Sequence, residues 1–104
     1  GADGIMIHSR KKTPDEVFEF AKKFRESGFK TPLVVVPTSY ASVTEDELER
    51  NGINVVIYAN QMLRSAYPAM LETAKSILSE RSAESTSKKI MSIKDILKLI
   101  PGTI

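Results

Sequence analysis

Three short apolar runs alternate with helix-forming stretches along this chain. The runs lie at residues 3–8, 33–36 and 53–58, and each is followed by a segment that carries helix-start signals or apolar residues at helical spacing. Parallel strands need a long crossover connection, which is usually a helix. The pattern therefore predicts an α/β fold with parallel strands in the order β-α-β-α-β-α, followed by a C-terminal tail.

Helix-start residues mark where the first two helices begin. Thr13 is expected to be the N-cap of the first helix, with Pro14 at its first position, where the missing N–H of proline costs nothing. Gly28 is expected to end that helix as a C′ glycine. Thr44, with a glutamate three residues on, fits the capping box of a short second helix.

The third helix is the longest and is expected over residues 61–80. Its apolar side chains form a wide stripe, and Pro68 is expected either to kink the helix or to mark its first turn. Residues 81–88 are polar and predict a linker, and residues 89–104 predict a helical tail. The expected division is thus three βα units over residues 1–80, followed by this linker and this tail.

The composition excludes several classes of protein. A length of 104 residues allows one domain at most, and a net charge of +2 with interspersed acids gives no basic stripe for nucleic acid. The sequence has no cysteine, which excludes disulfides and thiolate chemistry. No apolar stretch approaches the roughly 20 residues that span a bilayer, and the start does not resemble a signal peptide. We therefore expect a cytoplasmic protein without nucleic-acid or membrane partners.

Polar residues follow each of the three expected strands. His8 and Ser9 end the first strand, Thr38 follows the second, and Asn60 follows the third. In parallel α/β folds these positions share one rim, where ligands bind. The imidazole, the hydroxyl and the basic residues at 10–12 suit an anionic ligand. The structural alternatives are that His8 bonds a neighbouring carbonyl and that Asn60 is a helix N-cap.

No catalytic or metal-binding motif accompanies these rim residues. His8 is the only histidine and has no partner at metal-ligand spacing. His8 and Ser9 are neighbours in an extended segment, so their side chains point to opposite sides and do not suit Ser-His-Asp catalysis. The sequence also lacks the glycine-rich phosphate loops of nucleotide-binding proteins.

The size of the sheet limits what the chain can be. A three-stranded parallel sheet is a poor free-standing domain, because both faces and both edges need a cover. The pattern suits either a small doubly wound sheet or a stretch of a (β/α)8 barrel. Because the first strand starts at the beginning of the chain with no earlier strand to pair with, we expect part of a larger fold.

Four segments of the chain resemble one known family. They are residues 1–9, 35–40, 56–64 and 89–96, and they lie in order with compatible spacing. The second reads Val-Val-Pro-Thr-Ser-Tyr, and the third contains Ala-Asn-Gln-Met-Leu-Arg, which is the most discriminating part. Together they resemble the phosphoenolpyruvate mutase family of the isocitrate lyase superfamily over essentially the whole chain.

The resemblance implies a fold, a chemistry and an assembly. Members of the family are (β/α)8 barrels whose last helix swaps onto a neighbouring subunit. They use Mg²⁺ and interconvert phosphoenolpyruvate and phosphonopyruvate by moving a phosphorus bond between oxygen and carbon. The resemblance therefore implies that this chain is the last three βα units of such a barrel plus its terminal helices, within a homo-oligomer.

The resemblance also assigns residues. His8 matches the family histidine at the phosphonyl group, and Ser9 beside it is a weaker candidate for substrate binding. Thr38 and Asn60 are expected to support the same rim. The metal-binding acids and the phosphoryl-transfer residues of the family belong to earlier strands, so the resemblance implies no catalytic residue and no metal ligand in this chain. The segment alone is then expected to be inactive.

Other functions remain open on the sequence. Within the superfamily, the chain could belong to a phosphonopyruvate hydrolase or to a carbon–carbon lyase of the isocitrate type. Outside it, the chain could be a small α/β interaction module without enzymatic activity, its sheet completed by self-association. The His8-Ser9 strand end does not separate mutase from hydrolase, which the family's gating loop on earlier strands would do. Association of the chain in solution tests the interaction module.

Overall fold

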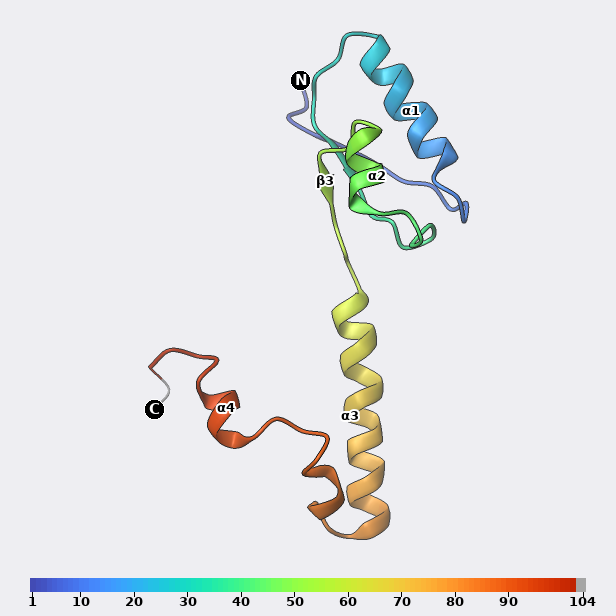
Figure 1. Ribbon diagram of the computed structural model, residues 1–104. Helices are drawn as coiled ribbons and strands as arrows, with labels where there is room; N and C mark the ends of the chain where they lie inside the picture. The colour runs from blue at the N-terminus through green and yellow to red at the C-terminus, as the bar shows by residue number, and fades with distance from the viewer. Residues whose placement is uncertain (103–104) are drawn as a thin grey trace. The chain divides into compact units, whose positions relative to one another are not determined.

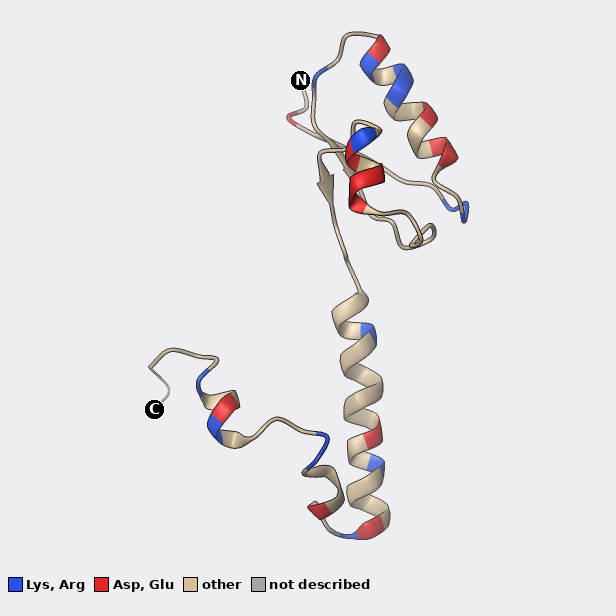
Figure 2. Cartoon of the chain, in the orientation of Figure 1, with Lys and Arg blue, Asp and Glu red and all other residues tan. Residues whose placement is uncertain are grey.

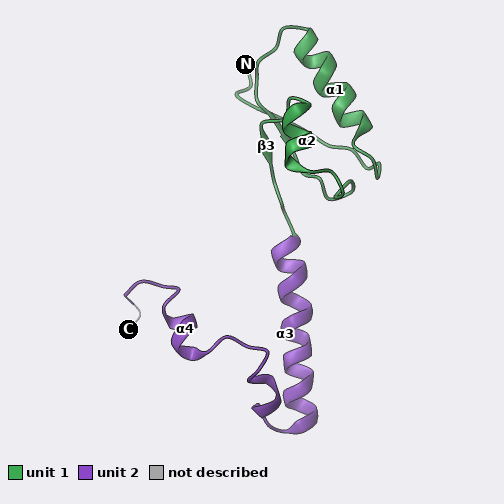
Figure 3. Ribbon diagram, in the orientation of Figure 1, with its two compact units in different colours: residues 1–60 green, residues 61–104 purple. Residues whose placement is uncertain are grey.

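The chain forms two compact units. The computed structural model describes residues 1–102, in which a first unit runs from Gly1 to Asn60 and a second unit begins at Gln61 (Figure 3). The expected division into residues 1–80, 81–88 and 89–104 concerns the units of a barrel and stays a prediction.

The first unit is a small parallel sheet with two helices. The strands lie in the order β1-β2-β3, and both neighbouring pairs are parallel. The α/β class predicted from the sequence is confirmed, although each strand is shorter than its apolar run. In chain order the elements are β1 (Ile5–Ile7), α1 (Asp15–Glu26), β2 (Leu33–Val35), α2 (Glu45–Arg50) and β3 (Val55–Val56) (Figure 1).

The hydrophobic core lies on one face of this sheet. It joins Leu33 and Val35 of β2 to residues of both helices, namely Val17 and Ala21 of α1 and Leu48 of α2, none more than 2% exposed. Strand residues two positions apart, such as Leu33 and Val35, share a face of the sheet. Both helices therefore pack on the same face.

The other face of the sheet carries apolar side chains that remain exposed. Met6, Val34 and Val55 are paired in register across the three strands. Met6 is 61% exposed and Val55 is 45% exposed, while Val34 is half-buried. Parallel sheets normally carry a covering layer on both faces. We call Met6, Val34 and Val55 the open face of the sheet.

The loop after β2 contributes to the core. The loop over residues 38–43 is mostly polar, yet the side chain of Tyr40 within it is only 1% exposed. Its hydroxyl has no hydrogen-bond partner within the described chain, and burial raises the pKa of this phenol. The apolar ring of Tyr40, packed in the core, therefore anchors a loop whose other residues are mostly polar.

The helix ends follow the predicted caps in all but one place. The hydroxyl of Thr44 accepts a hydrogen bond at 3.2 Å from the N–H three residues on, and Gly28 has a positive φ of 84°. At the start of α1, however, Pro14 occupies the N-cap position, and the hydroxyl of Thr13 donates to the carboxylate of Asp15 at 2.7 Å. The predicted Thr13 cap is wrong, because α1 begins one residue later than expected, which leaves Thr13 before the N-cap position.

The side chain of Arg25, at the end of α1, joins two loops at the amino end of the sheet. Its Nη1 donates to the carbonyls of Phe29 and Thr31 at 3.2 and 2.8 Å. Its Nη2 donates to the carbonyl of Gly52 at 2.9 Å and to Oδ1 of Asn54 at 2.8 Å. The guanidinium therefore ties the segments that precede β2 and β3 to α1. We call these five residues the arginine clamp.

One member of the clamp, Asn54, also fixes the alignment of β3 on β2. The N–H of Asn54 donates to the carbonyl of Leu33 at 2.9 Å, and Oδ1 of Asn54 accepts from the N–H of Leu33 at 3.0 Å. Gly52 has a positive φ of 84°, and a Cβ at this position would lie 3.5 Å from Nε of Arg25. A side chain at Gly52 is therefore disfavoured by its backbone conformation, although a Cβ there would meet Arg25 only at an ordinary contact distance.

The second unit is built on one long helix. α3 (Gln61–Glu80) is followed by η1 (Glu84–Thr86) and α4 (Ile93–Leu97) (Figure 1). The helix has the predicted bounds and continues on both sides of Pro68, so Pro68 does not mark its first turn. None of its residues is buried, and charged side chains are sparse along it (Figure 2). Within residues 1–102 no helix is long and apolar enough to cross a membrane.

The arginine clamp predicts a measurable stability difference. Arg25→Ala removes four hydrogen bonds made by a charged group, so we expect the free energy of unfolding to fall by about 2 kcal/mol, as measured by chemical denaturation. Lys22→Ala is the matched control, because Lys22 on the same helix makes an exposed ion pair with Glu26 at 4.0 Å. Equal losses in the two variants would contradict the role of the clamp.

Candidate functional site

The parallel register brings the carboxyl ends of the three strands to one edge of the sheet. β1 pairs with β2, and β2 pairs with β3, both in parallel. His8 directly follows β1, Thr38 lies three residues past the end of β2, and Asn60 lies four residues past the end of β3. All three predicted rim residues therefore follow strand ends on the edge where α/β proteins bind ligands.

His8 lies beside a small pocket between the end of β1 and the start of α1. The residue is exposed. The pocket has a volume of about 250 Å³ and is lined by Ile7, His8, Glu16, Val17 and Phe20. Glu16 and Val17 belong to the first turn of α1, so the pocket lies where the β1–α1 loop connects the strand to the helix. A ligand in solution has access to His8.

Ser9 differs from His8 in being only 4% exposed. Its hydroxyl donates to Oε2 of Glu16 at 2.6 Å and accepts from the N–H of Lys11 at 3.1 Å. Nζ of Lys11 in turn lies 2.8 Å from Oε1 of Glu16. These three residues form a closed set of contacts, the Ser9–Glu16–Lys11 network. His8 is exposed and Ser9 is buried, which agrees with the opposite orientations expected for their side chains.

The charges of the network stabilise one another. The hydrogen bond from Lys11, and after it the one from Ser9, lowers the pKa of the Glu16 carboxyl below its usual value. The hydrogen bond to Glu16 raises the pKa of the Lys11 ammonium. Lys11 is thus paired within the loop, although it is exposed like its neighbours Arg10 and Lys12. Among the basic residues expected to attract an anionic ligand, Lys11 already has a carboxylate partner.

Thr38 and Asn60 occupy less exposed positions than His8. Thr38 is half-buried, and its N–H donates to the carbonyl of Val36 at 2.8 Å, which forms a tight turn at the end of β2. Asn60 is half-buried and directly precedes α3. A binding role for Thr38, Asn60 and Ser9 stays a prediction.

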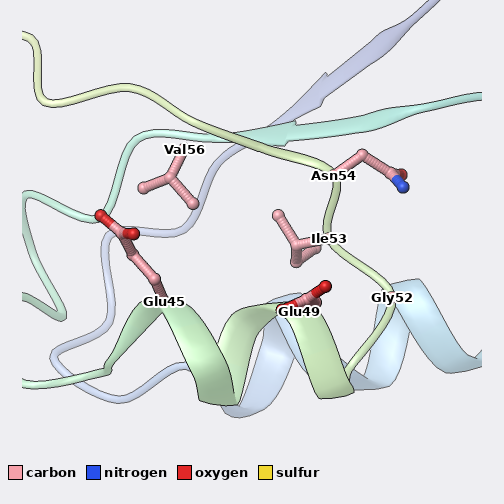
Figure 4. A pocket seen from close by; sticks show the side chains of 6 residues that line it. All are labelled: Glu45, Glu49, Gly52, Ile53, Asn54 and Val56. Atoms are coloured by element: carbon pink, nitrogen blue, oxygen red, sulfur yellow. The ribbon is translucent and has the colours of Figure 1, made fainter.

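A larger pocket lies along β3, on the side of α2. It has a volume of about 420 Å³, and Figure 4 shows Ile53 and Val56 pointing toward α2, which contributes Glu45 and Glu49 (Figure 4). The hydroxyl of Tyr58 donates to Oε1 of Glu45 at 2.8 Å, and this contact raises the pKa of Tyr58. Two carboxylates line this pocket, so it disfavours an anionic ligand. The rim beside His8 is the better candidate site.

The described residues do not fit a metal ion. Within residues 1–102, no group of three or more His, Cys, Asp or Glu side chains is arranged so as to hold one. The acid nearest to His8 in its pocket is engaged elsewhere, since Glu16 binds Ser9 and Lys11. No metal ligand is therefore assigned among residues 1–102.

Sequence reasoning missed the role of Glu16. In the sequence it is one of two acids in the first turn of a helix, a common arrangement because the helix dipole favours negative charge there. Its contact with Ser9 depends on how the loop over residues 10–14 returns to the strand end. A buried serine followed seven residues later by an acid is too general a pattern to predict that contact.

The architecture is that of an α/β protein with a parallel sheet. The family model described as phosphoenolpyruvate phosphomutase, another name for phosphoenolpyruvate mutase, matches residues 1–78. This chain belongs to the phosphoenolpyruvate phosphomutase family. The resemblance noted in the sequence is thereby confirmed.

Individual relatives agree with this family. The chain is 34% identical over 99 residues to a phosphoenolpyruvate phosphomutase of Tetrahymena pyriformis, covering 95% of this chain and 32% of that protein. It is 38% identical over 100 residues to a phosphonopyruvate hydrolase of Variovorax sp. (strain Pal2), covering 95% of this chain and 33% of that protein. The chain thus spans about a third of the length of the curated relatives it matches.

Solved structures show the same similarity. The crystal structure of a phosphoenolpyruvate phosphomutase from Streptomyces platensis subsp. rosaceus matches with a TM-score of 0.88 and 30% identity, over 95% of this chain and 33% of that one. A phosphonopyruvate hydrolase in complex with oxalate and Mg²⁺ matches with a TM-score of 0.83 and 38% identity, over 95% of this chain and 34% of that one. The chain therefore resembles both mutases and hydrolases.

The Ser9–Glu16–Lys11 network predicts a pH dependence. Because the pKa of Glu16 is lowered in the folded state, its contacts persist above the usual glutamate pKa and are lost as the pH falls through the lowered value. We expect the Glu16 carboxyl, followed by NMR titration, to have its midpoint below the usual value of about 4.3. Lys11→Ala should raise that midpoint, whereas Lys12→Ala should not. An unchanged midpoint in Lys11→Ala would contradict the pairing.

Proposed function

We propose that this chain supplies the phosphonyl-binding side of the active site in an enzyme that interconverts phosphoenolpyruvate and phosphonopyruvate. The observation that carries the proposal is the position of His8: an exposed imidazole directly after β1, on the edge where Thr38 and Asn60 also follow strand ends, in a member of this family. The complete enzyme joins this chain to further strands, and the chain alone is inactive.

Two features of the first unit support a barrel as the complete fold. The strands follow one another in sequence order, and both helices pack on the same face of the sheet. A (β/α)8 barrel repeats this arrangement, whereas a doubly wound sheet has helices on both faces. The open face of Met6, Val34 and Val55 then points into the barrel, whose interior is filled by such side chains. On this proposal residues 1–80 are the last three βα units.

The chemistry explains why a histidine suits this position. Interconversion breaks the phosphorus–carbon bond of phosphonopyruvate and forms a phosphorus–oxygen bond, or the reverse. Protein groups contribute to such transfers mainly by positioning the phosphoryl group and by stabilising charge on its oxygens. His8 would donate a hydrogen bond to one of these oxygens, with Thr38 and Asn60 bordering the same rim. Arg10 and Lys12, both exposed, add positive charge nearby.

Phosphonopyruvate hydrolysis is the second candidate function. The chain is 38% identical to a phosphonopyruvate hydrolase and 31–34% identical to three phosphoenolpyruvate phosphomutases. A hydrolase would transfer the phosphoryl group to water, which yields pyruvate and phosphate. Phosphorus NMR of the complete enzyme with phosphonopyruvate therefore separates the two, because a mutase yields phosphoenolpyruvate and a hydrolase yields inorganic phosphate. An isocitrate-type lyase would form neither product.

The proposal includes a cofactor and a partner. The complete enzyme is expected to use Mg²⁺, held by residues outside this chain, because the similar phosphonopyruvate hydrolase was solved in complex with oxalate and this ion. It is also expected to be a homo-oligomer in which the C-terminal helix packs on a second subunit. α3 supports this expectation, because it buries none of its residues and exposes large apolar side chains: Met62, Leu63, Tyr67, Met70, Leu71, Ile77 and Leu78.

The role of His8 can be tested in the complete enzyme. His8→Ala removes the donor to the phosphoryl oxygens, so we expect kcat/KM for phosphonopyruvate to fall by about 100-fold. Mg²⁺ affinity, measured by titration calorimetry, should change little because His8 is not a ligand. Lys12→Ala serves as the control for a general loss of positive charge in the same loop. Unaltered turnover in His8→Ala would overturn the assigned role.

The association state of the isolated chain tests whether the chain is part of a barrel. The open face and the free outer edges of β1 and β3 within the described residues should make residues 1–104 associate as concentration rises, which size-exclusion chromatography with light scattering detects. Met6→Lys places a charge on the open face and should reduce that association. A monomer at all concentrations that melts cooperatively would instead favour the small interaction module.

A further inference from the structure

The Ser9–Glu16–Lys11 network holds the loop that begins at His8 against the first turn of α1. The carboxylate of Glu16 binds the Ser9 hydroxyl through one oxygen at 2.6 Å and the Lys11 ammonium through the other at 2.8 Å. The N–H of Lys11 donates back to the Ser9 hydroxyl at 3.1 Å. Both carboxylate oxygens are thus used, and the first turn of α1 is joined directly to the end of β1.

This geometry has a consequence for His8. Ser9 is the next residue along the backbone, and its side chain is 4% exposed while His8 is exposed. Exposure alternates from the end of β1 into the loop, since Met6 and His8 are exposed while Ile7 is half-buried and Ser9 is buried. Because side chains alternate in this way along an extended chain, holding Ser9 inward turns His8 outward. His8 and Glu16 also line the same pocket. A displacement of about 1 Å in a group that positions a substrate can cost about 100-fold in rate.

We propose that Glu16 is a positioning residue, which holds His8 toward the phosphoryl group through its contacts with Ser9 and Lys11. This inference rests on the proposed function, since it assumes that His8 binds that group. It also gives Ser9 a different task from the one predicted: the hydroxyl of Ser9 orients the loop from inside and does not bind substrate. Glu16 itself does not contact the substrate.

A double-mutant cycle on the complete enzyme tests this proposal. Ser9→Ala and Glu16→Ala should each lower kcat/KM for phosphonopyruvate by about 10-fold. If the two residues act as one unit, the double variant should lose little more than either single variant, about 10- to 20-fold. The loss should appear mainly in kcat, because the orientation of His8 matters most when charge is redistributed on the phosphoryl oxygens. If Ser9 instead binds substrate independently of Glu16, the two single losses multiply, and the double variant should lose about 100-fold.

Controls separate positioning from a loss of folding. Glu19→Ala removes an acid one turn further along α1 that binds Lys23, and it should leave the rate unchanged. Glu16→Gln keeps an acceptor for Ser9 but loses the charge that binds Lys11, so it should lose less activity than Glu16→Ala. Amide exchange at Lys11 reports the loop without any substrate, and its protection should fall in Ser9→Ala and Glu16→Ala.

The outcomes distinguish the two proposals. An active enzyme in which Ser9→Ala and Glu16→Ala have additive losses, or in which Glu16→Ala retains full activity, overturns the positioning role alone. The positioning role is also overturned if the activity of every variant falls only in proportion to its melting temperature. A complete wild-type enzyme that converts neither phosphoenolpyruvate nor phosphonopyruvate overturns the proposed function, and the positioning role with it.

Discussion

The alignment of the sheet depends on the arginine clamp. β1 and β2 are three residues long and β3 is two, so the hydrogen bonds between strands are few and give a weak hold on register. The guanidinium of Arg25 supplies four further bonds at the amino end of the sheet, and its planar fork can reach several acceptors at once. The clamp holds the amino ends of β2 and β3, and because all three strands are parallel, their carboxyl ends and the residues that follow them share one edge.

The local patterns of the sequence predicted most of the elements. α3 was predicted with both ends correct because its apolar stripe is continuous over residues 61–80. β3 is much shorter than the apolar run at residues 53–58, because its ladder extends only along the part of β2 that it faces. The clamp could not be predicted, since Arg25 binds residues that are 27 and 29 positions away. Such contacts depend on the folded path of the chain.

The candidate site was likewise predicted only in part. Its rim was predicted, because a polar residue after a buried strand is visible in the sequence, and His8, Thr38 and Asn60 do follow the strand ends. The alternation of side chains along an extended segment also predicted that Ser9 and His8 differ in direction. The partner of Ser9 was not predicted. It depends on the turn of the β1–α1 loop, which brings Glu16 back to the strand end.

α1 links the clamp to the rim. Arg25 lies in its last turn and Glu16 in its first, nine residues apart, which corresponds to about 14 Å along a helix. Between them Val17 and Ala21 pack into the core and prevent the helix from sliding on the sheet. A shift of α1 would therefore move both ends together, so the stability of the sheet and the position of His8 are coupled. Variants of Glu16 should affect mainly the rim, whereas those of Arg25 should affect the whole unit.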